Sequence, residues 1–174
     1  MCYIVSINNN TTNSSALFGC IAKGASVKNL SLYGQLNGRV RLGGLAGYLL
    51  GSVDNITSYV TLTQAGTGNE TGTVGGIIAN QENSAGAITN CVNYGSITGE
   101  SYIFGGIVGS GGATIENCTN WGSVTAANVS IGGISGSTKD KGTISGCANF
   151  GTIRSTSKEY GKIGGIVGSA VKPI

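Results

Sequence analysis

The sequence predicts an all-β fold: a parallel β-solenoid (β-helix) of about five to six coils, with roughly three short strands in each coil. Two alternating repeats support this prediction. The first is a ten-residue unit with close copies at 88–97, 115–124 and 144–153 and looser copies at 27–36 and 53–62. The second is a six-residue unit that reads FGGIVG, IGGISG and IGGIVG at 104–109, 131–136 and 163–168. Units this short cannot bury a core alone, so their repetition predicts coils that stack.

The composition fits a packed array of coils. Glycine accounts for 32 of the 174 residues and proline for one, without the glycine at every third position that collagen requires. Apolar residues make up 40% of the chain, which argues against a disordered segment. Charged residues make up only 10%, so Ser, Thr, Asn and backbone groups are expected to provide most of the polar surface.

The ten-residue unit is expected to supply two strands of each coil and the six-residue unit the third. Ile and Val are interrupted every few positions by Asn and Gly, which is typical of short strands and turns rather than of helices. We therefore predict strands around 115–118, 122–125 and 131–136, and equivalent strands in the other coils. Parallel pairing of each strand with its counterpart one coil along would satisfy the backbone hydrogen bonds.

The segments between the repeats vary in length, so we expect loops there. They are polar or glycine-rich and lie at 64–73, 80–86, 99–102, 126–130, 137–142 and 154–161. Residues 1–25 are predicted to form a degenerate first coil, and residues 26–174 the regular repeats of a single domain, 1–174. The first residues lack the pattern of a signal peptide, and we interpret the chain as part of a longer protein.

Stacking also predicts which side chains fill the interior. The predicted core residues are Cys91, Cys118 and Cys147 of the ten-residue unit and Ile107, Ile134 and Ile166 of the six-residue unit. Leu30 and Ile56 hold the cysteine position in the upstream copies. A position shared by Leu, Ile and Cys is apolar, so we interpret these cysteines as free, buried thiols. Cys2 and Cys20 fall in no such column.

Two further columns are polar or aromatic. The first contains Asn29, Asn55, Asn90, Asn117 and Gly146. Asn and Gly both tolerate the left-handed backbone conformation, so this column predicts a tight corner, with asparagine side chains that can hydrogen-bond along the stack. The second contains Tyr33, Tyr59, Tyr94, Trp121 and Phe150. Aromatic rings one coil apart are expected to stack, and the column is interpreted either as a seal over a corner or as a ligand-binding stripe.

The net charge and the residue types present limit the kinds of catalysis and binding that the chain could perform. The chain has no histidine, which excludes Ser-His-Asp and Cys-His catalysis and histidine-ligated metals. Its seven acidic residues form no evident pair, so we predict no catalytic residue, no cofactor and no metal. A net charge of +3 does not indicate a nucleic-acid partner, and no run approaches the ~18 apolar residues of a membrane span. Lys and Arg are absent between Leu42 and Thr138 and occur towards the two ends, where they either prevent end-to-end association or form a ligand-binding patch.

The two alternating units resemble the GLUG repeat of large bacterial surface proteins, which also occurs in non-catalytic regions of immunoglobulin A-type peptidases. The resemblance extends from about Tyr3 to Ser169, and the first repeat departs most, with Cys20 and Lys23 where glycines are usual. It implies an extracellular, cell-surface stalk or adhesin that presents loops to a host or surface protein or glycan, next to other domains of a longer chain. Two alternatives are a carbohydrate-binding module that uses the aromatic stripe and a polysaccharide-degrading β-helix enzyme.

Overall fold

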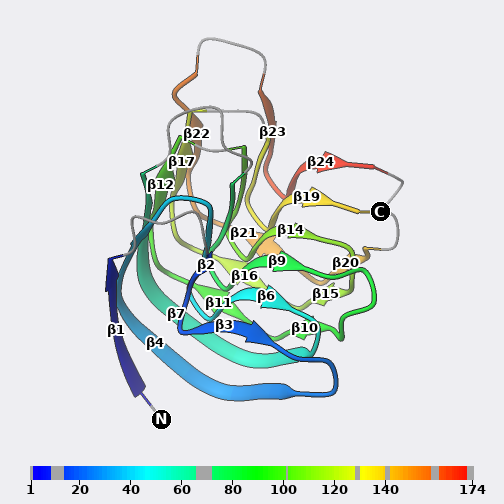
Figure 1. Cartoon of the computed structure of the whole chain (residues 1–174). Coiled ribbons are helices and arrows are strands. Elements are labelled where there is room, and N and C mark those ends of the chain that lie inside the picture. The colour runs from blue at the N-terminus through cyan, green and yellow to red at the C-terminus, as the bar shows by residue number, and fades with distance from the viewer. Residues whose placement is uncertain are drawn as a thin grey trace.

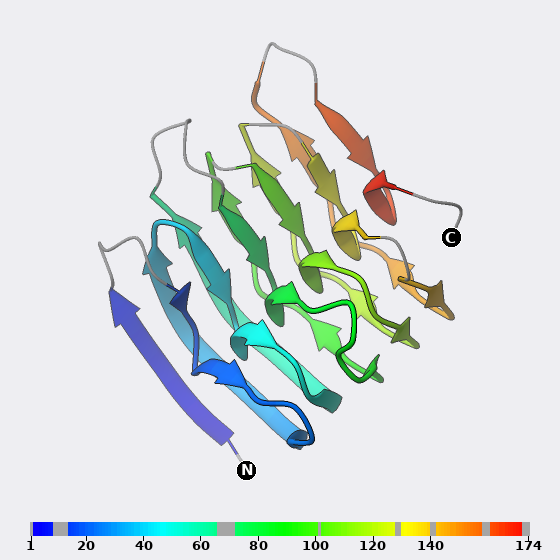
Figure 2. The same cartoon turned by 45° about the vertical axis from the view of Figure 1, so that its right-hand side comes forward.

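The computed structural model describes residues 2–8, 14–65, 72–100, 102–127, 130–139, 142–157 and 161–171. All of its regular elements are β-strands, arranged in three parallel sheets around a common interior. Successive coils lie on one another, and the two ends of the chain lie at opposite ends of the stack (Figures 1 and 2). The predicted parallel β-solenoid is therefore confirmed.

Sheet A is formed by the ten-residue units and has twelve strands. Its strands are β1 (Cys2–Asn8), β4 (Ser26–Gly38), β7 (Ser52–Gln64), β10 (Ile88–Thr89), β11 (Val92–Asn93), β12 (Ile97–Gly99), β15 (Ile115–Glu116), β16 (Thr119–Asn120), β17 (Val124–Ala126), β20 (Ile144–Ser145), β21 (Ala148–Asn149) and β22 (Ile153–Ser155). The single long strands β4 and β7 are followed in later coils by sets of three short strands.

Sheets B and C are formed by the six-residue units and have six strands each, one for each coil. Sheet B contains β2 (Ser14–Ser15), β5 (Arg41–Gly43), β8 (Thr73–Gly75), β13 (Ile103–Gly105), β18 (Ser130–Gly132) and β23 (Lys162–Gly164). Sheet C contains β3 (Phe18–Ile21), β6 (Ala46–Leu49), β9 (Ile78–Gln81), β14 (Val108–Gly111), β19 (Ser135–Thr138) and β24 (Val167–Ala170).

The six-residue unit is a corner rather than the single strand that the sequence predicted. In the copy at 104–109, β13 ends at Gly105 and β14 begins at Val108 in a different sheet. A Cβ atom on Gly105 would lie 1.9 Å from the carbonyl oxygen of Val108, and one on Gly106 would lie 2.1 Å from that of Gly133 in the next coil. The paired glycines are required because backbone segments approach closely both within the coil and between coils.

The interior is a continuous apolar core made of repeat columns. Leu42, Val74, Phe104 and Ile131 occupy one column in sheet B and are all fully buried. The same column ends at Ile163, which is 52% exposed because no described coil covers it on the C-terminal side. At the C-terminal end of the stack, this column therefore loses its burial where no further described coil covers it.

The predicted core positions follow the same rule. Ile107, Ile134, Cys91 and Cys118 are fully buried, whereas Cys147 is half-buried. Ile166 is 38% exposed, which corrects its assignment to the buried core. It belongs to the last described coil, where one side of the column is open.

Candidate functional site: the aromatic ladder and its neighbouring columns

The aromatic column forms a continuous ladder of rings on the outside of sheet A. Successive centroids, from Tyr33 through Tyr59, Tyr94 and Trp121 to Phe150, lie 4.8, 5.0, 6.5 and 4.2 Å apart, with interplanar angles of 5° to 20°. Each ring is set by the backbone of the preceding coil: the amides of Tyr94, Trp121 and Phe150 donate to the carbonyls of Ser58, Asn93 and Asn120 at 2.8 Å. Stacking of the predicted stripe is therefore a consequence of strand register.

The ladder is exposed, but mainly through the edges of its rings. The exposed fraction rises from 38% at Tyr33 to 62% at Phe150. Because neighbouring rings are nearly parallel and in contact, the faces of Tyr59, Tyr94 and Trp121 lie against other rings. Phe150 ends the described ladder, so its outer face has no described ring against it. The ladder thus offers solvent a row of ring edges and one open face.

A second asparagine ladder, which the sequence analysis missed, lies inside the coil. Asn93 and Asn120 are fully buried. The Nδ2 group of Asn93 donates to Oδ1 of Asn120 at 2.9 Å, and that of Asn120 donates to Oδ1 of Asn149 at 2.8 Å. Each amide also donates to a carbonyl of its own coil, at Gly95, Gly122 and Gly151 respectively. The sequence contained a signal for this ladder, because side chains alternate between the inside and the outside along a strand. This alternation places Asn93 in the same column as Leu32 and Ser58, which are buried.

The outer asparagine column has the predicted left-handed backbone. Asn29, Asn55, Asn90 and Asn117 have φ of 53° to 57°, and Gly146 has φ of 60°. The Nδ2 group of Asn55 donates to Oδ1 of Asn29 at 2.8 Å, whereas that of Asn90 donates to Asp54. Hydrogen bonds from Thr89 and Asn90 hold the pKa of the Asp54 carboxyl below its usual range. The column is a polar corner whose side chains are already used in contacts between coils.

The cysteine column joins adjacent coils, and two of its members, Cys118 and Cys147, are thiols with raised pKa values. The backbone amides of Cys91 and Cys118 each donate to the sulfur of the next cysteine at 3.4 Å, and all three cysteines of the column are free. The hydrogen bond with Cys147 lowers the pKa of Cys118, but the contact with Cys91 and burial outweigh it and raise the pKa to about 12. The contact with Cys118 and burial likewise raise the pKa of Cys147. A thiol with so high a pKa carries almost no thiolate at neutral pH.

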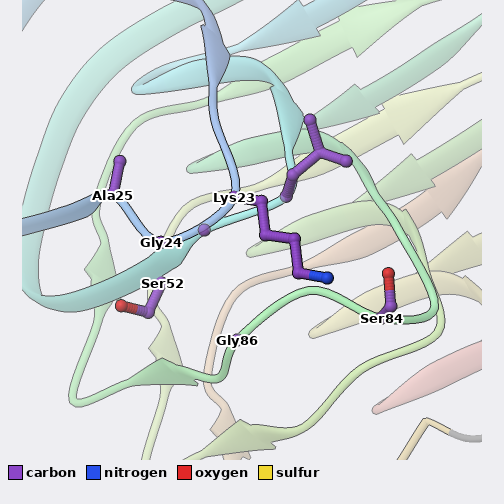
Figure 3. A pocket seen from close by; sticks show the side chains of 8 residues that line it. Lys23, Gly24, Ala25, Ser52, Ser84 and Gly86 are labelled. Carbon is purple, nitrogen blue, oxygen red and sulfur yellow. The ribbon is translucent and has the colours of Figure 1, made fainter.

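A shallow hollow of about 240 Å³ lies where the turns of three successive coils meet (Figure 3). It is lined by Lys23, Gly24, Ala25, Leu50, Gly51, Ser52, Ser84 and Gly86. The backbone amides of Ala25, Gly51, Ser52 and Gly86 already donate to carbonyl oxygens. Nearby, Tyr48 donates a hydrogen bond to Glu82, which raises the pKa of the tyrosine and lowers that of the carboxyl. The polar groups around this hollow therefore serve mainly to join the coils.

The exposed basic residues of the strands lie in the second coil and in the last described coil. Lys28 and Arg41 are exposed on β4 and β5, and Arg154 and Lys162 are exposed on β22 and β23 of the last coil. In the described part of the chain, no group of three or more Cys, Asp or Glu side chains is placed to hold a metal ion. Within the same residues, no helix is long and apolar enough to span a membrane.

The fold of this chain is also found in a solved structure. The chain is similar to the crystal structure of a candidate immunoglobulin A1 protease from Bacteroides ovatus, with a TM-score of 0.70 and 22% sequence identity. The similarity covers 87% of this chain and 53% of that protein, so the chain spans about half the length of the solved structure. No family model and no curated protein sequence matches the chain. At this identity the comparison establishes a shared β-solenoid architecture.

Proposed function

We propose that this chain is a non-catalytic repeat segment of a secreted or cell-surface bacterial protein, and that it acts as a rigid stalk or adhesin. The observation that carries the proposal is the aromatic ladder. Its inner ring faces, like the internal asparagines and the cysteine thiols, are used in contacts between coils. The repeated polar and aromatic side chains therefore stabilise a regular rod. The GLUG resemblance and the name of the solved structure support an extracellular setting.

The non-catalytic part of this proposal is tested with the purified chain and panels of substrates. Immunoglobulin A1, extracellular-matrix proteins and bacterial, plant and host glycans are each incubated with the chain, and products are analysed by mass spectrometry. We expect no cleavage, because the sequence has no histidine and no evident pair of acids. Any peptide or oligosaccharide product that disappears with heat-denatured chain would contradict the proposal.

The adhesive part is tested by binding. Labelled chain is applied to arrays of host proteins and glycans, with Trp121→Ala as a matched variant. A stalk that makes contact through other surfaces is expected to retain its binding in this variant. If the chain shows no saturable binding to any member of either array, the adhesin hypothesis is rejected. The chain would then be a spacer without adhesive function.

A carbohydrate-binding module is the second candidate, and the exposure of Trp121 (50%) and Phe150 (62%) favours it. Sugars bind aromatic side chains mainly through the ring face, and in this ladder the outer side of Phe150 is the described face that remains open. This candidate predicts that Phe150→Ala abolishes a glycan signal whereas Tyr59→Ala preserves it. An equal signal from both variants would exclude the ladder as a sugar platform.

A further inference from the structure

Three tyrosines occupy consecutive positions of the aromatic ladder. Tyr33 lies in β4, Tyr59 in β7 and Tyr94 directly after β11. The ring centroids of Tyr33 and Tyr59 lie 4.8 Å apart with an interplanar angle of 5°, and those of Tyr59 and Tyr94 lie 5.0 Å apart at 8°. The register of β1 places Ile4 at the preceding position of this column, and Trp121 follows Tyr94 with a centroid separation of 6.5 Å. The column therefore continues past the three phenols in both directions.

The backbone fixes the spacing of these phenols, while the ring edges remain open to solvent. Tyr33 is opposite Tyr59 in the long parallel pairing of β4 with β7, and the amide of Tyr94 donates to the carbonyl of Ser58 at 2.8 Å. The exposed fractions of Tyr33, Tyr59 and Tyr94 are 38, 42 and 46%. A one-electron oxidant can therefore reach each ring while the neighbouring ring stays in contact with it.

The side chains that flank the central ring are short. In β7, the buried Ser58 and Val60 alternate with Thr57, Tyr59 and Thr61, which lie on the outer face. A threonine thus stands two positions before the ring and another two positions after it. Exposed side chains turn about their single bonds within picoseconds to nanoseconds, and this short-chained surface gives the ring of Tyr59 room to turn towards either neighbour.

Two stacked phenols can undergo oxidative coupling. Each phenol loses one electron and one proton and becomes a phenoxyl radical, whose unpaired electron is shared with the ring carbons ortho to the oxygen. A C–C bond then forms between one ortho carbon of each ring, and the hydrogen on each of these carbons moves as a proton to a phenol oxygen. The two electrons and two protons removed at the start reduce one hydrogen peroxide to two waters. Because the rings are already in contact, the coupling needs no encounter between two chains.

We propose that Tyr59 is an oxidative cross-linking site, which forms dityrosine with Tyr33 or Tyr94 when the chain meets hydrogen peroxide and a haem peroxidase. Tyr59 is the shared partner because it has a phenol ring on each side in the ladder. Trp121 is a less favourable partner for Tyr94, since their centroids are 6.5 Å apart. The link joins adjacent coils covalently. It depends on the geometry of the ladder and not on the proposed role as a stalk or adhesin.

Peroxidase treatment of the intact chain tests the site. Dilute chain is treated with a haem peroxidase and hydrogen peroxide and is then digested with trypsin and Glu-C protease together. Cleavage after Lys, Arg and Glu places Tyr33, Tyr59 and Tyr94 on separate peptides, 29–39, 42–70 and 83–100. We expect dityrosine fluorescence and two cross-linked pairs by mass spectrometry, 29–39 with 42–70 and 42–70 with 83–100. Each pair should be lighter by two hydrogens than the sum of its peptides, and fragmentation should place the link at Tyr59.

Matched variants separate the ladder from the general reactivity of tyrosine. Tyr59→Phe keeps a ring in the stack but removes the phenol oxygen, so it is expected to lower the yield of dityrosine within one chain at least about tenfold. Tyr102→Phe alters a tyrosine of similar exposure, 36%, outside the ladder and should leave the yield unchanged. Three results would each overturn the proposal: no dityrosine within the chain, including oxidation that stops at Trp121; links that join two chains in denaturing gels; or an unchanged yield in Tyr59→Phe.

Discussion

At the scale of single residues, the same amino acid has opposite roles at positions three residues apart. Asn117 has φ of 53° and lies on the outside of a corner, whereas Asn120 is fully buried and hydrogen-bonded on both sides. The first position needs a residue that tolerates the left-handed region, which glycine does at least as well. The second needs an amide that both donates and accepts, because its neighbours in the ladder are buried. The free energy of unfolding should therefore respond very differently to the two asparagines.

The internal ladder predicts a large effect for Asn120→Ala. The substitution removes the acceptor of one of the two hydrogen bonds that Nδ2 of Asn93 donates and the donor to Oδ1 of Asn149. It also creates a cavity, so we expect the free energy of unfolding to fall by about 2–4 kcal/mol. Asn117→Gly is the matched control and should change it by less than about 0.5 kcal/mol, as Gly146 in the same column indicates. Urea denaturation followed by far-ultraviolet circular dichroism measures both. Equal losses of the free energy of unfolding in Asn120→Ala and Asn117→Gly would show that the hydrogen bonds of the internal ladder add nothing to stability.

The buried thiols predict a loss of stability in alkali. The pKa of Cys118 is raised from 9.0 to about 12 in the folded chain, so its contribution is fully present below pH 9. Above pH 9 the unfolded state releases the proton more readily, and the free energy of unfolding falls by about 1.4 kcal/mol per pH unit until the folded pKa is reached. Because other groups also titrate there, the measurement is the difference between the original chain and Cys118→Val from pH 8 to 11. Parallel pH profiles would contradict the raised pKa.

At the scale of elements, the Gly-Gly corner determines the cross-section of the coil. From β5 onwards, each strand of sheet B ends at the first glycine, and the chain turns at once into sheet C. The second glycine of each copy before the last coil lies under the corner of the next coil: a Cβ atom on Gly106 would be 2.4 Å from Cγ of Asn120 and 2.1 Å from the carbonyl oxygen of Gly133. The Gly-Gly corner and the internal asparagine ladder therefore pack directly against each other, and this packing sets the spacing between coils.

The corner column supplies a matched pair of substitutions. Gly106→Ala introduces a Cβ atom into backbone at 2.1 Å, and we expect a loss of more than about 3 kcal/mol in the free energy of unfolding, or failure to fold. Gly165→Ala makes the same change in the last coil, where nothing lies within 4 Å of the added atom, and it should be within about 0.5 kcal/mol of the original chain. Thermal unfolding compares the two. A severe defect in Gly165→Ala would show that these glycines act through backbone conformation rather than close approach.

At the scale of the whole molecule, stability comes from contacts between adjacent coils. Each coil supplies one residue to every column, so interior members are covered on two sides and the last described members on one. Ile163 and Ile166 are accordingly exposed, although their counterparts Ile131 and Ile134 are fully buried. In such an array the free energy of unfolding is close to a sum of coil and interface contributions. Substitutions within one column should therefore depend on their distance from the end.

The aromatic ladder tests this dependence. Tyr59→Ala removes a ring with neighbours at 4.8 and 5.0 Å on its two sides, whereas Phe150→Ala removes a ring with one described neighbour at 4.2 Å. At about 0.5–1.5 kcal/mol per stacked pair, we expect Tyr59→Ala to lower the free energy of unfolding by about 1–3 kcal/mol and Phe150→Ala by about half as much. Urea denaturation measures both losses. A larger loss at Phe150 would show that ring stacking does not govern the ladder.

Much of this structure could be predicted from repeat columns, and the exceptions have a common cause. The columns identified the stacked rings, and the replacement of Asn117 by Gly146 in its column identified the left-handed corner. They did not reveal that Asn120 points inward or that Gly105 and Gly106 form a corner, because these depend on where the path of one coil meets the next. Parts of the predicted loops 64–73, 99–102, 126–130, 137–142 and 154–161 lie outside the described residues, namely 66–71, 101, 128–129, 140–141 and 158–160.

The sequence by itself determined the class of fold and the partners within each column, because side chains repeated at equivalent positions of stacked coils necessarily become neighbours. Only the tertiary structure decided which columns face inward and which ring faces remain open. Those properties depend on contacts between residues far apart in the sequence, from 26 positions for Ser26 with Ser52 to 35 positions for Val53 with Ile88. Repetition along the chain specifies that such residues meet, but their orientation is fixed only when the backbones of adjacent coils are packed together.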